Sequence, residues 1–188
     1  MEKILDLDRN LTLALNGLHS PFFDNIMIFA SKVWVWLPLY IAVFIWFFCT
    51  RKWRVALVCV GALLLGVLIT DRLSFHIKEA IERLRPFVDP VIADSVRLLE
   101  KPGSHLFGFP SGHACNTFCA ALLSSLIAGR KWWAPVAFSW ATLVSYSRIY
   151  VGKHFLGDVL AGALLGLAIG GLLFLMIRKW LLRYSNPE

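Results

Sequence analysis

Five apolar stretches restrict the fold of this 188-residue chain more than any other feature. They cover residues 33–50, 54–75, 112–128, 132–149 and 155–178. Each approaches the length of about 20 apolar residues that a helix needs to cross a bilayer. Hydrophobic residues make up 58% of the chain, against about 45–50% in soluble domains. The sequence therefore predicts an all-α fold, a polytopic membrane helix bundle with about five transmembrane helices.

The N-terminal segment has a different pattern. Its large aliphatic residues recur at helical spacing, with polar residues between them, at Ile4, Leu7, Leu11, Leu15 and Leu18. This spacing predicts an amphipathic helix lying on the membrane surface. We therefore expect an interfacial segment at 1–31, a transmembrane domain at 32–183 and a short tail at 184–188. Whether part of the first segment also crosses the membrane stays open.

Three polar clusters lie at the ends of the apolar stretches. They read Lys78-x6-Arg85-Pro86, Pro110-Ser111-Gly112-His113 and Ser147-Arg148-x5-His154-x3-Asp158. Together they supply three cations, two histidines, a carboxylate and a Ser-Gly helix start. This set of groups can hold a phosphate and break its ester bond without a metal.

The third cluster pairs a histidine with a carboxylate. His154 and Asp158 are four residues apart, so a helix would place them on one face, where the carboxylate can orient the imidazole. The other ring nitrogen is then free to act as a nucleophile. Taken alone, the pair fits a structural His–Asp contact at a helix end equally well.

The second cluster precedes an apolar stretch. Ser111 suits a helix N-cap, and the free amides of a helix start bind anions, which Gly112 would let approach closely. His113 would then lie in the first turn, beside the anion. Taken alone, the motif also describes an ordinary capped helix with an interfacial histidine.

The first cluster and Arg148 supply the cations. A helix that continues to Pro86 would align Lys78 and Arg85 on one face, because they are seven residues apart. The planar guanidinium of Arg148 matches the oxygens of a phosphate. Taken alone, these residues also fit a basic helix end and an arginine that reaches for the membrane surface.

In combination, the three clusters resemble the three-part signature of the type 2 phosphatidic acid phosphatase family. These are membrane-integral lipid phosphatases of the acid phosphatase and vanadium haloperoxidase superfamily. The signature reads Lys-x6-Arg-Pro, Pro-Ser-Gly-His and Ser-Arg-x5-His-x3-Asp, and every fixed position is matched here. The resemblance covers about residues 54–178 and leaves out residues 1–31 and the loop 87–109.

The resemblance implies a mechanism. His154 would attack the phosphorus to form a phosphohistidine, Asp158 would orient His154, and His113 would protonate the leaving oxygen and then activate water. The non-bridging oxygens would be held by Lys78, Arg85, Ser111, Gly112 and Arg148. Phosphoryl transfer depends mainly on positioning and charge neutralisation, so we expect no metal and no cofactor.

The expected substrate is a phosphorylated membrane lipid whose tail stays in the bilayer. Within the family the candidates are undecaprenyl diphosphate, our first choice, then phosphatidylglycerophosphate, phosphatidic acid and lipid A 1-phosphate. In the loop 87–109, Arg97, Lys101 and His105 either select the headgroup or are solvated charges. The net charge of +7 is not concentrated in one run, which favours a bilayer over nucleic acid as the partner.

Short basic connections predict the orientation of the chain. They lie at one set of helix ends, at Arg51, Lys52, Arg54, Arg130, Lys131, Arg178, Lys179 and Arg183. Short basic connections usually face the cytoplasm. We therefore expect a multi-pass protein of the cell (inner) membrane whose active site faces the periplasm or exterior.

Small residues leave the oligomeric state open. Gly162, Gly166 and Gly170 are spaced by four, a pattern that lets helices approach closely, either inside one chain or in a dimer. The four cysteines lie in apolar stretches without a metal-like spacing, so we interpret them as small buried hydrophobic residues.

Three other functions are compatible with parts of the pattern. A lipid phosphotransferase would use the same residues with a second lipid as acceptor. A transporter would need polar groups at several membrane depths, whereas these gather at one boundary. A lipid-binding protein with an inactive site would lack a nucleophile, whereas both histidines are present.

Overall fold

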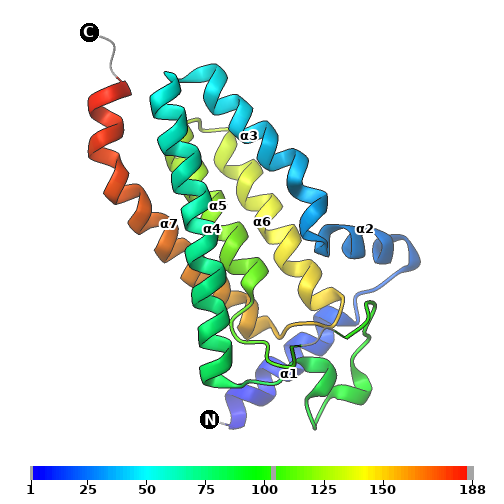
Figure 1. Cartoon of the computed structure of the whole chain (residues 1–188). Helices are drawn as coiled ribbons and strands as arrows, with labels where there is room; N and C mark the ends of the chain where they lie inside the picture. The colour runs from blue at the N-terminus through cyan, green and yellow to red at the C-terminus, as the bar shows by residue number, and fades with distance from the viewer. Residues whose placement is uncertain (1, 103–104, 186–188) are drawn as a thin grey trace.

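The computed structural model describes residues 2–102 and 105–185. The helices are α1 (Glu2–Asn16), α2 (Pro21–Ser31), α3 (Leu37–Thr50), α4 (Trp53–Ile81), α5 (Gly112–Ala128), α6 (Trp133–Tyr150) and α7 (Leu156–Ser185). Three 3-10 turns join them, η1 (Val33–Trp36), η2 (Pro86–Val88) and η3 (Ala93–Ser95). Helices α3 to α7 form an elongated bundle, with α1 crossing one end and α2 beside it (Figure 1). The predicted all-α membrane bundle is confirmed, and each of the five apolar stretches forms a helix.

The bundle contains helices of membrane-spanning character. Within the described residues, three segments are long and apolar enough to cross a bilayer: Val33–Thr50, Trp53–Ile81 and Leu156–Tyr184. They expose large hydrophobic side chains, such as Ile41, Leu64 and Leu172, as lipid contact requires. Helices α5 and α6 are shorter or less apolar, because polar residues occupy the ends that face the site.

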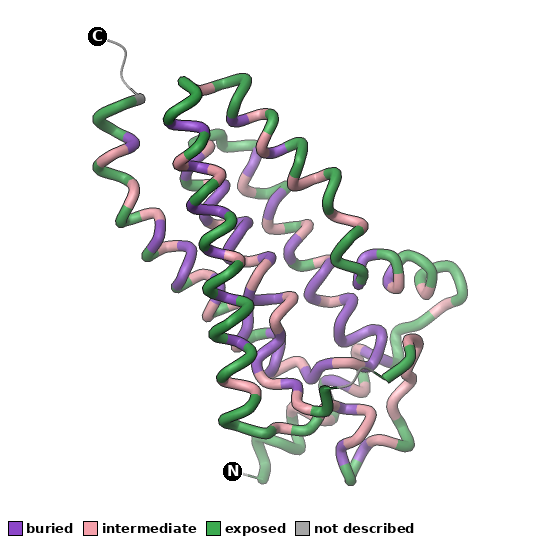
Figure 2. The backbone as a smooth tube through the Cα atoms, viewed as in Figure 1, coloured by how far each residue is buried: buried purple, intermediate pink, exposed green. Residues whose placement is uncertain are grey.

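Helix α5 lies at the centre of the bundle and packs against α4, α6 and α7. The buried residues of α5 lie along its contacts with these helices (Figure 2). A Cβ atom on Gly162 would lie 2.5 Å from the carbonyl oxygen of Ser111, and one on Gly170 would lie 2.9 Å from that of Cys119. The glycine stripe therefore packs α7 onto α5 inside one chain.

The cysteines only partly match the prediction. Cys59, Cys115 and Cys119 are buried free thiols, but Cys49 is exposed near the end of α3. The prediction of a buried position was wrong for Cys49, because Cys49 lies on the exposed side of this turn, whereas Phe47 in the same turn is buried in the core.

Helices α1 and α2 are too short to span a bilayer. They contain 15 and 11 residues, about 22 and 16 Å at 1.5 Å per residue, whereas the hydrocarbon core is about 30 Å thick. Between them, Ser20 is the N-cap of α2, and its side chain accepts a hydrogen bond from the amide of Phe23. Helix α1 is amphipathic as predicted, and its exposed residues include large aliphatic side chains such as Ile4, Leu7 and Leu11.

Candidate active site

The first cluster begins on α4 and continues past its end. The helix stops at Ile81 because Glu82 adopts a left-handed conformation and donates its amide hydrogen to the carbonyl of Lys78 at 2.9 Å. The prediction that the helix continues to Pro86 was therefore wrong. Arg85 is instead extended, as a residue before proline prefers, and its amide bonds to the carbonyl of Leu106 at 2.9 Å.

The second cluster starts α5 at the predicted place. Ser111 occupies the N-cap position, but its side chain makes no capping hydrogen bond, so the predicted cap is not formed. The first α5 amides are free of helix partners. A Cβ atom on Gly112 would lie 3.4 Å from Nζ of Lys78, which places the helix start directly beside this cation.

The third cluster forms the turn into α7. His154 lies before the helix and Asp158 lies in its first turn. One carboxylate oxygen of Asp158, Oδ2, is 3.4 Å from Nδ1 of His154 and accepts the amide hydrogen of Phe155 at 3.0 Å. The predicted His–Asp contact is present, although a helix start holds it and not a continuous helix.

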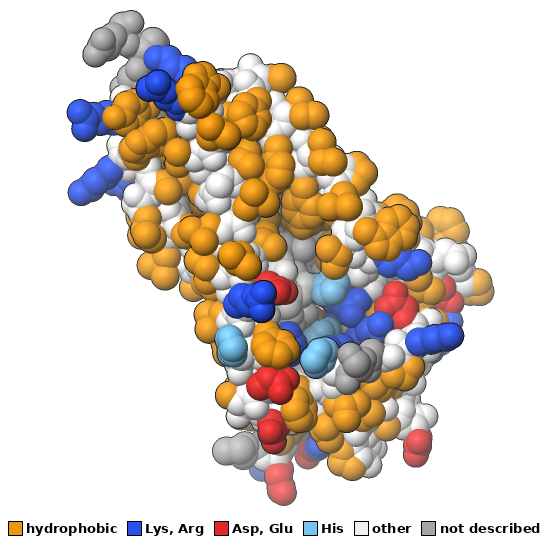
Figure 3. Space-filling view, viewed as in Figure 1, with side chains coloured by type: hydrophobic (Ala, Val, Ile, Leu, Met, Phe, Trp, Pro, Cys, Tyr) orange, Lys and Arg blue, Asp and Glu red, His pale blue; other side chains and the backbone are white. Residues whose placement is uncertain are grey.

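The clusters converge on one cavity of about 750 Å³. Six of the eight predicted site residues line it: Lys78, Arg85, Gly112, His113, Arg148 and His154. The other two lie behind it, where the amide of Ser111 donates to the carbonyl of Asp158 at 2.9 Å. Apolar side chains of α3 to α6 complete the walls. On the face shown in Figure 3, charged and histidine side chains gather in a band below a broad hydrophobic surface.

Ser31, at the end of α2, joins two of the predicted residues. Its carbonyl oxygen lies 3.1 Å from Nε2 of His113, and its hydroxyl accepts a hydrogen bond from Nη1 of Arg148. Glu100 hydrogen-bonds the same hydroxyl at 3.3 Å and pairs with Lys153 at 2.7 Å. The end of α2 and the loop 87–109 therefore close one side of the site.

Among the residues predicted to bind phosphate, two buried polar atoms have no hydrogen-bond partner among the described residues. They are Oγ of Ser111 and Nε of Arg148. Such atoms cost free energy unless a partner satisfies them. Both are suited to donate to the oxygens of a phosphate.

The electrostatic environment favours an uncharged imidazole on His154. His154 lies in the turn outside the spanning helices, where burial first, and then the positive charges of Arg85 and Arg148, hold its pKa well below its ordinary value of 6.5. Burial also lowers the pKa of Arg85. The imidazole is therefore unprotonated at pH 7, as nucleophilic attack requires.

Sequence reasoning missed several residues beside the site. Arg83 lies two positions before the motif arginine, and its Nη1 is 2.8 Å from Oδ1 of Asp158. A Cβ atom on Gly108 would lie 2.8 Å from Oδ2 of the same carboxylate. The R-x-R-P spacing was a signal for Arg83, whereas Gly108 and Ser31 come from segments that only the fold brings near.

The loop 87–109 is fastened to the N-terminal helices. Nη1 of Arg97 donates to Asp24 at 2.7 Å, and its backbone amide donates to the side chain of Asn16 at 2.9 Å. The Arg97 hydrogen bond lowers the pKa of Asp24 to about 2. Arg97 therefore has a tethering contact, and its predicted contact with a headgroup stays a prediction.

Comparison with known proteins identifies the family. The model of the PAP2 superfamily matches residues 56–181. A lipid A 4'-phosphatase of Porphyromonas gingivalis is 39% identical over 90% of this chain and 72% of its own length. An undecaprenyl-diphosphatase of Sulfolobus acidocaldarius is 36% identical over 85% of this chain and 69% of its own length.

A solved structure shares the fold. It is the crystal structure of a transmembrane PAP2-type phosphatidylglycerolphosphate phosphatase from Bacillus subtilis, with a TM-score of 0.74 and 27% identity. The match covers 95% of this chain and 88% of the other. Together with the membrane-spanning helices, these likenesses show that the chain belongs to the PAP2 superfamily and is a multi-pass membrane lipid phosphatase.

Proposed function

We propose that this protein removes phosphate from a membrane lipid through a phosphohistidine on His154. One observation carries this proposal: a single cavity has histidines and phosphate-binding cations at one end and apolar walls along the rest. A lipid phosphate has the same two parts. The phosphate fits the polar end, while the hydrocarbon chain fits the apolar walls of α3 to α6.

In the first step, Nε2 of His154 attacks the phosphorus, because Nδ1 faces Asp158. The N–P bond forms, the bond from phosphorus to the lipid oxygen breaks, and His113 donates a proton to that oxygen. In the second step, His113 takes a proton from water, which attacks the phosphorus. The N–P bond then breaks and phosphate leaves.

The cations neutralise the charge that spreads over the non-bridging oxygens. Lys78, Arg85 and Arg148 line the cavity around His154, and the amides at the start of α5 add the positive end of a helix dipole. This set supplies the charge neutralisation that a metal ion often provides. We therefore propose that the reaction is metal-independent.

For the substrate we propose a lipid A-type phosphomonoester first and undecaprenyl diphosphate second. The support is the higher identity and coverage of the lipid A 4'-phosphatase relative. The three relatives carry the names of three different lipids. We propose that the headgroup preference of this chain is set beside the site, where the end of α2 meets the loop 87–109 at the Ser31–Glu100 contact.

The distribution of charge supports the proposed orientation. Arg51, Lys52, Arg54, Arg130 and Lys131 lie at the turns opposite the site, and no Asp or Glu of the described residues lies at that end. Basic short loops favour the cytoplasmic side. We therefore place the site at the outer face of the cell membrane.

The test is phosphate release by the purified protein in detergent with EDTA present. The panel holds lipid A, undecaprenyl diphosphate, phosphatidylglycerophosphate and phosphatidic acid. We expect release that persists in EDTA, disappears in His154→Ala and falls about 10²- to 10⁴-fold in His113→Ala, which loses acid–base catalysis. Normal turnover by His154→Ala would refute the mechanism. Release only when a second lipid is added would identify a phosphotransferase.

A further inference from the structure

Helix α1 presents several polar residues to the protein, including Asp8 and Thr12, whereas Lys3, Asp6 and Asn10 are exposed. Oδ1 of Asp8 accepts the amide hydrogen of Gly157 at 2.8 Å, and Oγ1 of Thr12 accepts that of Leu156 at 3.0 Å. These are the first two amides of α7, which have no partner within their own helix. Side chains of α1 therefore cap the helix that carries Asp158.

The same carboxylate of Asp8 also reaches a cation. Nη2 of Arg83 lies 2.6 Å from Oδ2 of Asp8, while its Nη1 lies 2.8 Å from Oδ1 of Asp158. The guanidinium lies 4.3 Å from the centre of the Phe155 ring. Two carboxylates and one aromatic ring thus fix its position, and it does not line the catalytic cavity.

Asp158 divides its two oxygens between different partners. Oδ2 faces His154 and the amide of Phe155, while Oδ1 receives Arg83. The carboxylate is fully buried, so removal of Arg83 would leave Oδ1 without a charged partner. It would also remove the group that holds the plane of the carboxylate toward Nδ1 of His154.

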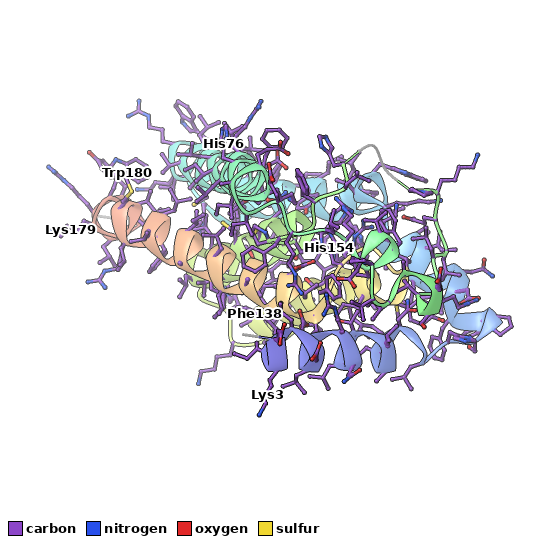
Figure 4. The ribbon with its side chains drawn as sticks, turned by 90° about the horizontal axis from the view of Figure 1, so that it is seen from below. Lys3, His76, Phe138, His154, Lys179 and Trp180 are labelled. Carbon is purple, nitrogen blue, oxygen red and sulfur yellow. The ribbon has the colours of Figure 1, made fainter. Side chains whose placement is uncertain are left out.

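The view from below shows how these elements lie (Figure 4). Helix α1 runs beside the start of α7, Lys3 points away from the bundle, and His154 lies within it. The outward side of α1 exposes the large apolar residues Ile4, Leu7 and Leu11 together with Lys3, Asp6 and Asn10. One helix therefore has a face suited to the lipid surface and a face in contact with the catalytic turn.

We propose that Asp8 and Arg83 are positioning residues for the phosphatase reaction. The contacts run from Asp8 through Arg83 and Asp158 to His154. They couple the packing of α1 against the bundle to the orientation of the His154 imidazole. This inference rests on the proposed function. It adds two residues that are not fixed positions of the three motifs. Arg83 lies at a variable position of the first motif, and Asp8 lies on an N-terminal helix that the family signature does not cover.

The chain offers a matched control on the same helix. Arg9, next to Asp8, pairs with Asp89 of the loop at 3.1 Å and also tethers α1, but it does not contact Asp158 or Arg83. Asp8→Asn and Arg9→Gln therefore each remove one ion pair between α1 and the rest of the protein, and Arg9→Gln also removes the pair with Asp6 inside α1. Only Asp8→Asn affects the proposed coupling.

The kinetic test compares kcat and KM of these variants on the lipid that the wild-type protein hydrolyses best. We expect kcat to fall about 10- to 100-fold in Arg83→Gln, as for a buried polar group that loses its partner, with KM within about threefold. Asp8→Asn should lower kcat less, Arg83→Lys should recover part of it, and Arg9→Gln should stay within about twofold. Equal losses in Asp8→Asn and Arg9→Gln would overturn the proposal, because they would indicate a general role of α1 docking.

A double-mutant cycle tests whether Asp8 acts through Arg83. Coupled residues are not additive, so Asp8→Asn should cause little further loss of kcat in the Arg83→Gln background. Fully additive losses would overturn the proposed chain of contacts.

A spectroscopic measurement decides the coupling without any substrate. In [¹⁵N]histidine-labelled protein in micelles, the ring signals of His154 are identified by their loss in His154→Gln. We expect these signals to shift in Arg83→Gln and Asp8→Asn and to stay in place in Arg9→Gln. Unchanged His154 signals in all variants would overturn the proposal. If no lipid were hydrolysed while the signals shifted as expected, the proposed function would fail and the structural coupling would stand.

Discussion

The two ends of the helix bundle use basic residues in different ways. At the site end, cations meet carboxylates: Arg83 with Asp158, and Lys153 with Glu100. At the opposite end, the described residues include no Asp or Glu, and Arg130 is exposed. These ion pairs hold the side chains around the cavity that Lys78, Arg85 and Arg148 line. The cations at the opposite end have no carboxylate of the described chain near them and are suited to the mobile headgroups of a membrane surface.

The largest difference should appear when one arginine from each end is replaced. Arg148→Gln removes a buried cation from the cavity, and loss of one preorganised group that stabilises a transition state costs about 10²- to 10³-fold in kcat. Arg130→Gln changes an exposed residue and should leave kcat within about twofold. Rates of lipid phosphate release check both. Similar losses in the two variants would remove the distinction between the ends.

A second substitution tests the packing behind the nucleophile. In Gly108→Ala the new methyl group would meet Oδ2 of Asp158 at 2.8 Å and displace the carboxylate from His154. We expect kcat to fall about 100-fold, as misplaced catalytic groups do. Gly61→Ala is the control, since nothing lies within 4 Å of its added methyl group, and its kcat should not change. A fully active Gly108→Ala would show that the catalytic pair tolerates displacement.

A third substitution separates the core of the bundle from both ends. A Cβ atom on Gly166 would lie 3.0 Å from the backbone nitrogen of Cys119 on α5, so Gly166→Ala should destabilise the fold by about 1–3 kcal/mol through overpacking. In Gly171→Ala the nearest atom, Cδ2 of Leu122, lies at 3.9 Å, so stability should hold or rise. Thermal unfolding in detergent measures both. Equal melting temperatures would refute the close α5–α7 contact.

The smallest effect concerns pH. The pKa of His154 is held below its ordinary value of 6.5, by burial first and by Arg85 next. Folded His154 therefore takes up a proton only at a pH below 6.5, whereas His154 of the unfolded chain takes it up near 6.5. As pH falls below about 6.5, the unfolded state gains this protonation first, so folding stability falls. An NMR titration of the His154 ring should show a midpoint below 6.5. A midpoint at or above 6.5 would contradict the buried, cation-rich environment.

Much of the fold and site could be predicted from the sequence, because the deciding signals are local. Apolar length fixed the five bundle helices, and the order of three motifs at apolar boundaries indicated that Lys78, His113 and His154 meet. The end of α4 was not predictable, because the left-handed conformation of Glu82 is unusual for a residue other than glycine.

The contacts of α1 were also hidden from the sequence. Its spacing of aliphatic residues predicted an amphipathic helix, but not that Asp8 and Thr12 would bond to the amides of α7. Those partners lie 144 and 149 residues away along the chain. Polar side chains can be buried only where hydrogen-bond partners are available, and here the fold brings those partners from a distant segment. Ser111 is the converse case, since a good local N-cap residue leaves its hydroxyl unpaired toward the site.

The most direct test of the central claim is to find the covalent phosphate. His113 acts in both steps of the proposed mechanism, so the wild-type protein is mixed with an excess of the best lipid substrate, quenched in alkali during turnover and digested for mass spectrometry. We predict a phosphate on the peptide that contains His154 and none in the His154→Ala variant. A phosphate on another residue, or active protein that never carries one, would contradict the phosphohistidine mechanism.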